Sequence, residues 1–133
     1  MRLYRLKKEE RLSGKKRIEE LFREGSSFFY SPFRVLWKFR GDGHPAVPDA
    51  RIAIAVSRRN FKKAVHRNLI KRRIREAYRK NKSVLTKWLR EKMLTVDVVF
   101  VYTGSQILSY RDIEEKIIIT LRKIIEENEK GTD

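Results

Sequence analysis

The first periodic pattern lies near the N-terminus, where apolar residues recur at helical spacing. Ile18, Leu21 and Phe22 occupy positions i, i+3 and i+4, and charged residues surround them. Residues with this spacing share one face of an α-helix. Gly25 follows, and glycine is common just after a helix ends. The pattern predicts a short amphipathic helix over residues 15–24.

Alternation of side chains replaces this spacing in the segments that follow. Over residues 33–40 the period is two, so successive side chains point to opposite faces of a strand. Residues 51–57 repeat the alternation, and residues 96–102 are rich in β-branched and aromatic side chains. These segments predict three strands, and the apolar piece 27–30 predicts a short edge strand. One face of the strand at 33–40 carries Phe33, Val35, Trp37 and Phe39.

Further helices are predicted on either side of the last strand. Residues 62–80 contain neither Gly nor Pro, and residues 82–92 predict a short helix that holds Trp88. Residues 109–112 resemble a capping box, which marks the start of a helix. The apolar stripe of that final helix is Ile113, Ile117, Leu121 and Ile124.

The element order α-β-β-β-α-β-α predicts an α+β fold, a two-layer α/β sandwich with a central mixed sheet. The chain has 133 residues, which fits one domain. The Gly- and Pro-containing stretch at 41–48 is interpreted as a loop between strands and not as a linker. We therefore expect one domain over residues 1–133, with a basic N-terminal arm at 1–12 and a frayed C-terminal tail at 127–133.

Charge identifies the class of partner. The chain has 33 Lys and Arg against 17 Asp and Glu, a formal net charge of +16. Such an excess opposes compaction unless a polyanion neutralises it, so nucleic acid is the leading partner and the domain is interpreted as RNA-binding. A merely soluble surface would mix both signs with a smaller net charge. A membrane-surface helix would need a broad apolar face, which no segment provides.

Several other classes of protein are excluded by features that the sequence lacks. It has no cysteine, which rules out a disulfide scaffold, a thiolate zinc site and a cysteine nucleophile. The longest apolar runs, 52–56 and 98–102, are far shorter than the roughly 18 residues that a membrane-spanning helix needs. The first dozen residues are charged throughout and hold no signal-peptide core. We expect a soluble, cytoplasmic protein.

The helix predicted at 62–80 carries the candidate binding chemistry. At about 100° per residue, five cations and one amide fall within an arc of roughly 140°. Like charges at i, i+4 destabilise a helix, so selection for stability alone would break this series. The alternative interpretation is a solvated face, and binding is favoured over it because only Glu76 interrupts the positive series. The arc holds Arg67, Asn68, Lys71, Arg72, Arg75 and Arg79.

Catalytic constellations are not found in the sequence. Adjacent acidic pairs such as Glu19-Glu20 diverge within a helix, and neither His44 nor His66 has a partner at metal-ligand spacing. No glycine pattern typical of a phosphate-binding loop occurs. We expect no catalytic residue and no metal site in the chain, and if RNA is cut where it binds, the chemistry belongs to another molecule.

One continuous segment resembles a known family. Residues 56–76, VSRRNFKKAVHRNLIKRRIRE, resemble the signature of the bacterial ribonuclease P protein component, whose hallmark is an RNxxKRxxRE helix. The similarity extends to Arg11-Leu12 and to the segment 97–102. It implies an α/β sandwich with a left-handed βαβ crossover. The chain departs from the pattern at Leu69 and Arg73, where a cation and a bulky apolar residue are usual.

The resemblance also implies a role. Family members bind a large catalytic RNA, and together they remove the 5′ leader of precursor tRNA by magnesium-dependent hydrolysis. The magnesium is held mainly by the RNA, the protein alone binds no cofactor, and no protein partner or membrane is required. The implied RNA-binding residues are Arg58, Arg59, Lys62, Lys63, Arg67, Asn68, Lys71, Arg72 and Arg75. A cleft between the first helix and the sheet, implied to hold the single-stranded leader, is lined by Ile18, Phe22, Val35, Trp37 and Ser57.

Two other functions fit parts of the sequence. A structural RNA-binding protein of the ribosomal type would use the same composition and basic helix, but it would have no use for a leader cleft. The third hypothesis is a DNA-architectural protein, which a preference for RNA over DNA duplexes would exclude. For Phe22 and Trp37 taken alone, core packing is the simpler interpretation, and only the resemblance places them in a binding cleft.

Overall fold

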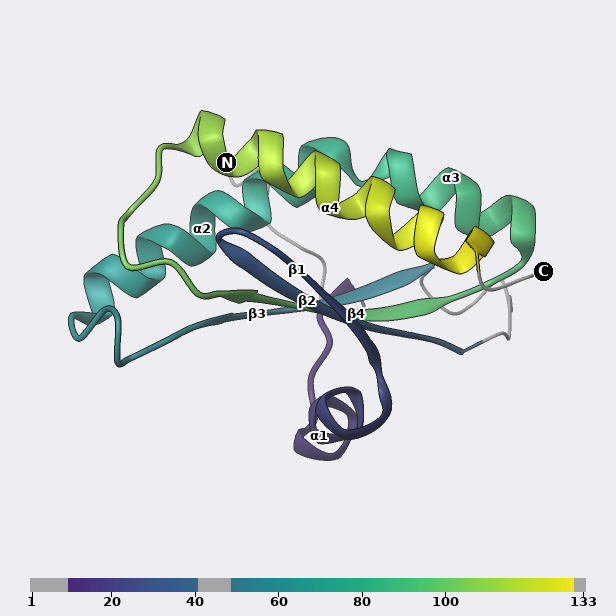
Figure 1. Ribbon diagram of the computed structural model, residues 1–133, viewed down its shortest axis with the longest axis horizontal. Helices are drawn as coiled ribbons and strands as arrows, with labels where there is room; N and C mark the ends of the chain where they lie inside the picture. Colours follow the sequence, from purple (N-terminus) through teal and green to yellow (C-terminus); the bar gives the residue numbers. More distant parts are fainter. Residues whose placement is uncertain (1–9, 41–48, 131–133) are drawn as a thin grey trace.

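The computed structural model describes residues 10–40 and 49–130, and its elements follow the predicted order (Figure 1). The short helix expected over 82–92 is present as a separate element. Most of the predicted basic arm, the loop at 41–48 and residues 131–133 lie outside the described residues. The elements are α1 (Lys15–Glu24), β1 (Ser26–Tyr30), β2 (Phe33–Phe39), β3 (Ala50–Val56), α2 (Ala64–Asn81), α3 (Ser83–Lys92), β4 (Val96–Tyr102) and α4 (Tyr110–Lys130).

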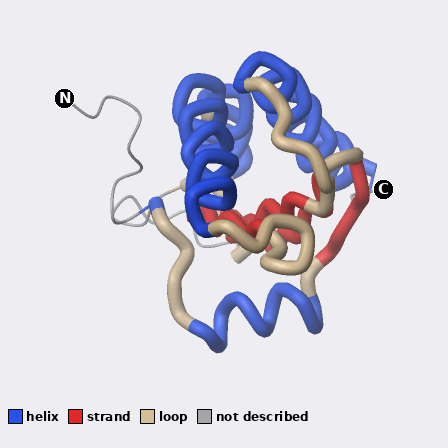
Figure 2. Tube along the Cα trace, turned by 90° about the vertical axis from the view of Figure 1, so that its left-hand side faces the viewer, coloured by secondary structure: helices blue, strands red, loops and turns tan. Residues whose placement is uncertain are grey.

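The strands form one mixed sheet in the order β1-β2-β4-β3. β1 pairs antiparallel with β2 and β2 pairs antiparallel with β4, whereas β3 lies parallel to β4. The helices α2 and α3 connect the parallel pair, which makes β3-α2-α3-β4 a βαβ unit; its left-handedness stays a prediction. Helices α2, α3 and α4 cover one face of the sheet, and α1 lies against the other (Figures 1 and 2). The predicted α+β fold with a central mixed sheet is confirmed.

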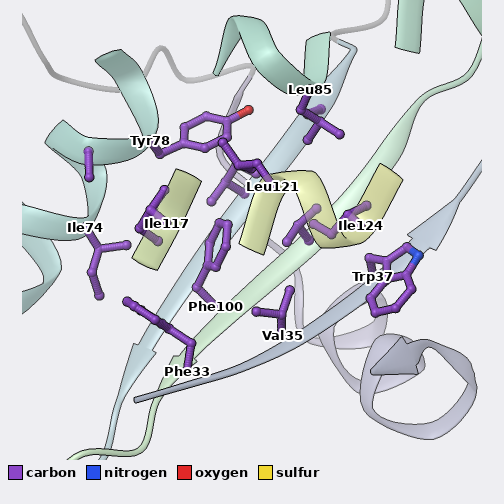
Figure 3. Close-up of a cluster of buried hydrophobic side chains, with 14 of the residues drawn as sticks. Phe33, Val35, Trp37, Ile74, Tyr78, Leu85, Phe100, Ile117, Leu121 and Ile124 are labelled. Atoms are coloured by element: carbon purple, nitrogen blue, oxygen red, sulfur yellow. The ribbon is translucent and has the colours of Figure 1, made fainter. Parts of the chain in front are cut away.

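The main core lies between the sheet and the helices α2, α3 and α4 (Figure 3). Phe33, Val35 and Phe100 point into it from β2 and β4, and all three are fully buried. From the helices, Ile74 and Ile117 meet them with no exposed surface. Burying a side chain of this size stabilises the fold by about 1.5–3 kcal/mol. This cluster therefore fixes the position of α2, on which the predicted binding residues lie.

A smaller core lies on the other face of the sheet, under α1. Leu21 of α1 packs with Leu36 of β2 and Val99 of β4, and Leu12 joins them from the N-terminal segment. Ile18 is partly buried against the same cluster. The alternation of side chains along each strand separates this cluster from the main core.

The starts of the two long helices differ in their capping. At α4, Ser109 Oγ accepts a hydrogen bond of 3.2 Å from the Asp112 N–H, as the capping box predicts. The helix expected from residue 62 begins only at Ala64, and the carbonyl of Lys63 accepts from the N–H groups of His66 and Arg67. Lys62 and Lys63 consequently belong to the loop that precedes α2.

The C-terminal tail predicted to fray is helical as far as Lys130. Trp88 Nε1 of α3 donates a hydrogen bond of 3.1 Å to Glu129 Oε1, and Ile124 is fully buried one turn earlier. The local sequence does not reveal this contact between α3 and α4, and fraying of the tail stays a prediction.

Tyr78 gives the core a dependence on alkaline pH. Its ring has no exposed surface, and burial, with smaller contributions from Glu10 and Asp49, raises the pKa of its hydroxyl. The hydroxyl ionises near pH 10 in the unfolded chain but stays protonated in the folded one. As the pH rises, the unfolded chain therefore loses this proton before the folded chain does. The free energy of unfolding then falls by about 1.4 kcal/mol per pH unit above pH 10. Urea denaturation at pH 9 and pH 11 is expected to show a larger loss of stability for the unchanged chain than for Tyr78→Phe; equal losses would contradict this assignment.

Candidate nucleic-acid interface

The loop between β3 and α2, residues 57–63, is folded onto itself by local hydrogen bonds to Ser57. The Phe61 N–H donates to the Ser57 carbonyl at 3.1 Å, and the Arg59 N–H donates to Ser57 Oγ at 3.1 Å. Phe61 is buried, and its ring centroid lies 6.1 Å from that of Tyr102. With its apolar residue turned inward, the loop directs its cations outward, and Arg58, Arg59, Lys62 and Lys63 are all exposed.

A second set of contacts joins this loop to the segment between β4 and α4. Asn60 Nδ2 donates to the carbonyl oxygens of Thr103 and Gly104, at 3.1 and 3.2 Å. Arg73 of α2 reaches the same segment, where its Nη1 donates to the Leu108 carbonyl at 2.6 Å. Arg73, unexpected on this side of the helix, thus pairs with a backbone carbonyl instead of entering the core. The Asn60 side chain thus ties the middle of the cationic loop to the segment between β4 and α4.

Arg67 has a structural role that the sequence did not indicate. Its Nη1 atom donates to the carbonyl oxygens of Phe61 and Lys62, both at 2.8 Å. Arg67 sits close to the buried stripe of α2 and is half-buried. One arm of its guanidinium therefore fastens the loop to the first turn of the helix, and its predicted role as an RNA contact is limited to the remaining nitrogens.

Substitution of Arg67 tests this assignment. Arg67→Ala removes two hydrogen bonds from a charged donor, so we expect the free energy of unfolding to fall by about 1.5–3 kcal/mol. Arg72→Ala removes the same charge from an exposed position, and its effect on stability is expected to stay within about 0.5 kcal/mol. Urea denaturation of both variants distinguishes the two cases. Equal stabilities would show that the loop does not depend on Arg67.

The exposed face of α2 is rotated from the arc that the sequence predicted. Ile70, Ile74, Ala77 and Tyr78 form the buried stripe, which reaches the predicted arc at Arg67. Lys71 is half-buried at the edge of this stripe, whereas Asn68, Arg72 and Arg75 are exposed. We define the cationic face of α2 as Asn68, Lys71, Arg72 and Arg75.

The N-terminal segment adds charges to this face, which the sequence did not predict. Arg11 pairs with Ile52 as a parallel β-bridge beside β3. Partial burial and then the nearby charge of Arg11 lower the pKa of Arg75. Arg79, placed in the predicted arc, forms an ion pair with Glu10 at 3.3 Å between Nη1 and Oε1. The arc therefore divides into cations that face outward, Arg67 that donates to loop carbonyls, and Arg79 that is held by a carboxylate.

The residues predicted to line a leader cleft do not share one surface. Ile18 and Phe22 belong to α1, but Val35 and Trp37 point to the opposite face of the sheet and lie in the main core (Figure 3). Their exposed fractions are 0% and 6%. The cleft prediction is wrong for Val35 and Trp37, because the alternation of β2 directs them away from α1. Ser57 lies at the end of β3, half-buried, with its hydroxyl bonded within the loop.

A different row of residues lies beside α1. Across the sheet the register aligns Phe29, Arg34, Val101 and Ala55, each pointing to the face that α1 covers only in part. Phe22 is 46% exposed and Phe29 is 64% exposed. The Arg34 guanidinium lies 5.8 Å from the centroid of the Phe22 ring, within the range of a cation–π contact. The alternation at 33–40 places Arg34 opposite the apolar face and was the available signal for this row. We define the α1 surface as Phe22, Phe29, Arg34, Ala55 and Val101.

At the other end of α1 the charges are compensated. Lys38 Nζ contacts Glu20, and it lies 3.2 Å from Glu24 Oε2. Hydrogen bonds to these carboxylates raise the pKa of Lys38, and the hydrogen bond from Lys38 lowers the pKa of Glu20. Within residues 10–40 and 49–130, no three Asp, Glu or His side chains form a group able to hold a metal ion. None of the helices in this part of the chain is long and apolar enough to cross a membrane.

Comparison with known proteins decides the family. A sequence model of the family described as Ribonuclease P matches residues 6–125. The chain belongs to the ribonuclease P protein family. The ribonuclease P protein component of Porphyromonas gingivalis is 33% identical over 119 residues, which cover 90% of this chain and 85% of that protein. The ribonuclease P protein component of Petrotoga mobilis is 32% identical over 130 residues, with 89% and 93% covered.

Solved structures of ribonuclease P proteins have the same fold. The RNase P protein of Thermotoga maritima is 28% identical with a TM-score of 0.66, and the match covers 86% of this chain and 96% of that one. The RNase P protein of Staphylococcus aureus has a TM-score of 0.65 at 22% identity, with 87% and 94% covered, which concerns the fold alone. The predicted function, that of a protein subunit of the ribonucleoprotein endoribonuclease ribonuclease P, is confirmed by the family, and membership implies association with an RNA subunit. Family membership favours this function over that of a ribosomal-type or DNA-architectural protein.

Proposed function

We propose that the chain binds the catalytic RNA of ribonuclease P through the β3-α2 loop and the cationic face of α2. The observation that supports this most is that four loop cations are exposed while the loop itself is fixed by Asn60 and Arg67. Because the loop backbone is already fixed, it loses little freedom when its cations meet phosphates. Arg forks bind phosphate oxygens in a bidentate manner, and Asn68 offers a donor and an acceptor to a base edge or a 2′-hydroxyl.

The substrate in this proposal is precursor tRNA, and its single-stranded 5′ leader binds at the α1 surface. Exposed aromatic rings with a cation beside them suit unpaired nucleotides, because bases stack on the rings and phosphates pair with the cation. Phe22, Phe29 and Arg34 supply these groups. Ile18 borders this surface, whereas Val35 and Trp37 support it only from within the core.

Hydrolysis of the phosphodiester bond that joins the leader to the tRNA is assigned to the RNA subunit in this proposal. Magnesium would be held mainly by the RNA, where it would supply an activated water and stabilise the leaving oxygen. The chain's own residues bind and orient RNA, and no proton-transfer or metal-binding step is assigned to them. The protein would act in the cytoplasm, where tRNA precursors are made, without a further protein partner.

Leader binding has a direct test. Phe22→Ala is expected to weaken binding of a precursor tRNA with a leader by about 1–3 kcal/mol in the complex with the RNA subunit, the usual worth of one stacked base. Binding of mature tRNA, which has no leader, should stay unchanged. Equilibrium binding with both RNAs provides the measurement. Equal losses for both, or no loss for either, would contradict the assignment of the leader to the α1 surface.

A further inference from the structure

One carboxylate lies among the cations of α2. Glu10 Oε1 is 3.3 Å from Arg79 Nη1, and Glu10 Oε2 is 2.8 Å from Lys82 Nζ. The side chain of Glu10 is 13% exposed and that of Arg79 is 19% exposed. A single acidic residue therefore neutralises two cations at the C-terminal end of the helix, in a place that is largely shielded from water. We call this three-residue contact the Glu10 bridge.

The backbone fixes the position of Glu10. The Leu12 N–H donates to the Ile52 carbonyl at 2.8 Å, and Arg11 pairs with Ile52 as a parallel bridge. Leu12 is buried in the smaller core. The carboxylate is thus held over α2 by strand pairing and apolar packing, which distinguishes it from a pair of flexible surface side chains.

We propose that Glu10 is a specificity-determining residue that ends the RNA-binding surface of α2 at Arg75. The inference rests on the proposed function, in which RNA contacts this helix. Every cation that meets a phosphate adds affinity for any RNA, regardless of sequence or shape. By holding Arg79 and Lys82, Glu10 removes two cations from this unselective attraction.

An RNA phosphate does not easily replace Glu10 in the bridge. Displacement would release a mostly buried carboxylate from two partners, and opening a shielded ion pair costs more than an exposed phosphate contact gains. The bridge accordingly stays closed when RNA is bound. On this side of the molecule, the cations left for RNA are those of the β3-α2 loop and, on α2, Lys71, Arg72 and Arg75.

Glu10→Gln tests the proposal because it removes the charge and keeps the shape of the side chain. The probe is an RNA duplex of unrelated sequence, and its binding is measured over a series of salt concentrations. We expect the log–log salt dependence to become steeper by about one to two. The ratio of affinity for the catalytic RNA to affinity for this duplex is expected to fall. The matched control is Glu127→Gln, which removes the same charge from an exposed position on α4 and is expected to leave the salt dependence unchanged.

A second variant separates this role from a purely structural one. Lys82→Gln should leave the salt dependence unchanged in the native background, where Lys82 is already paired, and should reduce the steepening in the Glu10→Gln background. An unchanged slope in Glu10→Gln, or a shallower slope in Lys82→Gln alone, would overturn the proposal. The second of these is measurable even if Glu10→Gln does not fold. Absence of any salt-dependent binding by the native chain would instead contradict the proposed function itself.

Discussion

Replacing the four exposed cations of the β3-α2 loop with glutamine is expected to lower affinity for the catalytic RNA by on the order of a hundredfold. The fold should persist, because the loop is held by Asn60, Arg67 and backbone contacts, none of which uses these four side chains. With four fewer phosphates neutralised, the log–log salt dependence should become shallower by about three to four. Filter binding over a series of salt concentrations measures both quantities. The variant changes Arg58, Arg59, Lys62 and Lys63.

The control for this variant carries the same change in net charge at the other end of the molecule. It replaces four exposed cations of α3 and α4 with glutamine, and its affinity for the catalytic RNA should stay within a few-fold of the native value. Equal losses in the two variants would show that net charge, and not the position of the loop, determines binding. The control changes Lys87, Lys92, Arg122 and Lys130.

Trp37→Ala is expected to lower the free energy of unfolding by about 3–5 kcal/mol, as for other large aromatic residues truncated in a core. Trp37 is 6% exposed, and its ring centroid lies 5.4 Å from that of Phe28. The truncation leaves a cavity between β2 and the helices that pack on it, which the surrounding side chains fill only in part. Urea denaturation measures the loss. Because an average domain is stable by about 5–15 kcal/mol, this one change removes a large part of the total.

Phe22→Ala provides the contrast on the opposite face of the sheet. Its ring is nearly half exposed, so the expected loss of stability is below about 1 kcal/mol. Trp37 thus supports the fold, whereas Phe22 is proposed to contact the leader. If Trp37→Ala kept its stability and lost leader binding, the placement of Trp37 in the core would be wrong and the cleft predicted from the sequence would be right.

The order of elements and the burial of each strand follow from local patterns. Alternation at 33–40 correctly separates Phe33, Val35 and Trp37 from Arg34 and Lys38. It does not reveal which helix covers which face, because both faces of β2 meet helices. The family resemblance placed Val35 and Trp37 beside α1, whereas the apolar face of β2 packs against the larger layer of helices.

For the candidate binding surface, the sequence indicates which helix carries the cations but not which groups hold their side chains. Helical periodicity gives the direction in which Arg67 and Arg79 leave α2, although Arg67 lies closer to the buried stripe than the predicted arc implies. It gives no information on the loop carbonyls that accept from Arg67 or on the carboxylate of Glu10, since these contacts depend on how distant segments meet. For the same reason Phe29 was not among the predicted site residues, because its place beside Arg34 depends on how β1 pairs with β2.

Cleavage of a precursor tRNA with and without each subunit tests the central claim most directly. At low magnesium, the RNA subunit with the chain is expected to remove the leader much faster than the RNA alone, and the chain without RNA should leave the precursor intact. Cleavage by the purified chain alone would show that the polypeptide performs the chemistry. No gain from adding the chain to its RNA subunit would show that the cationic loop and the α1 surface do not serve this reaction.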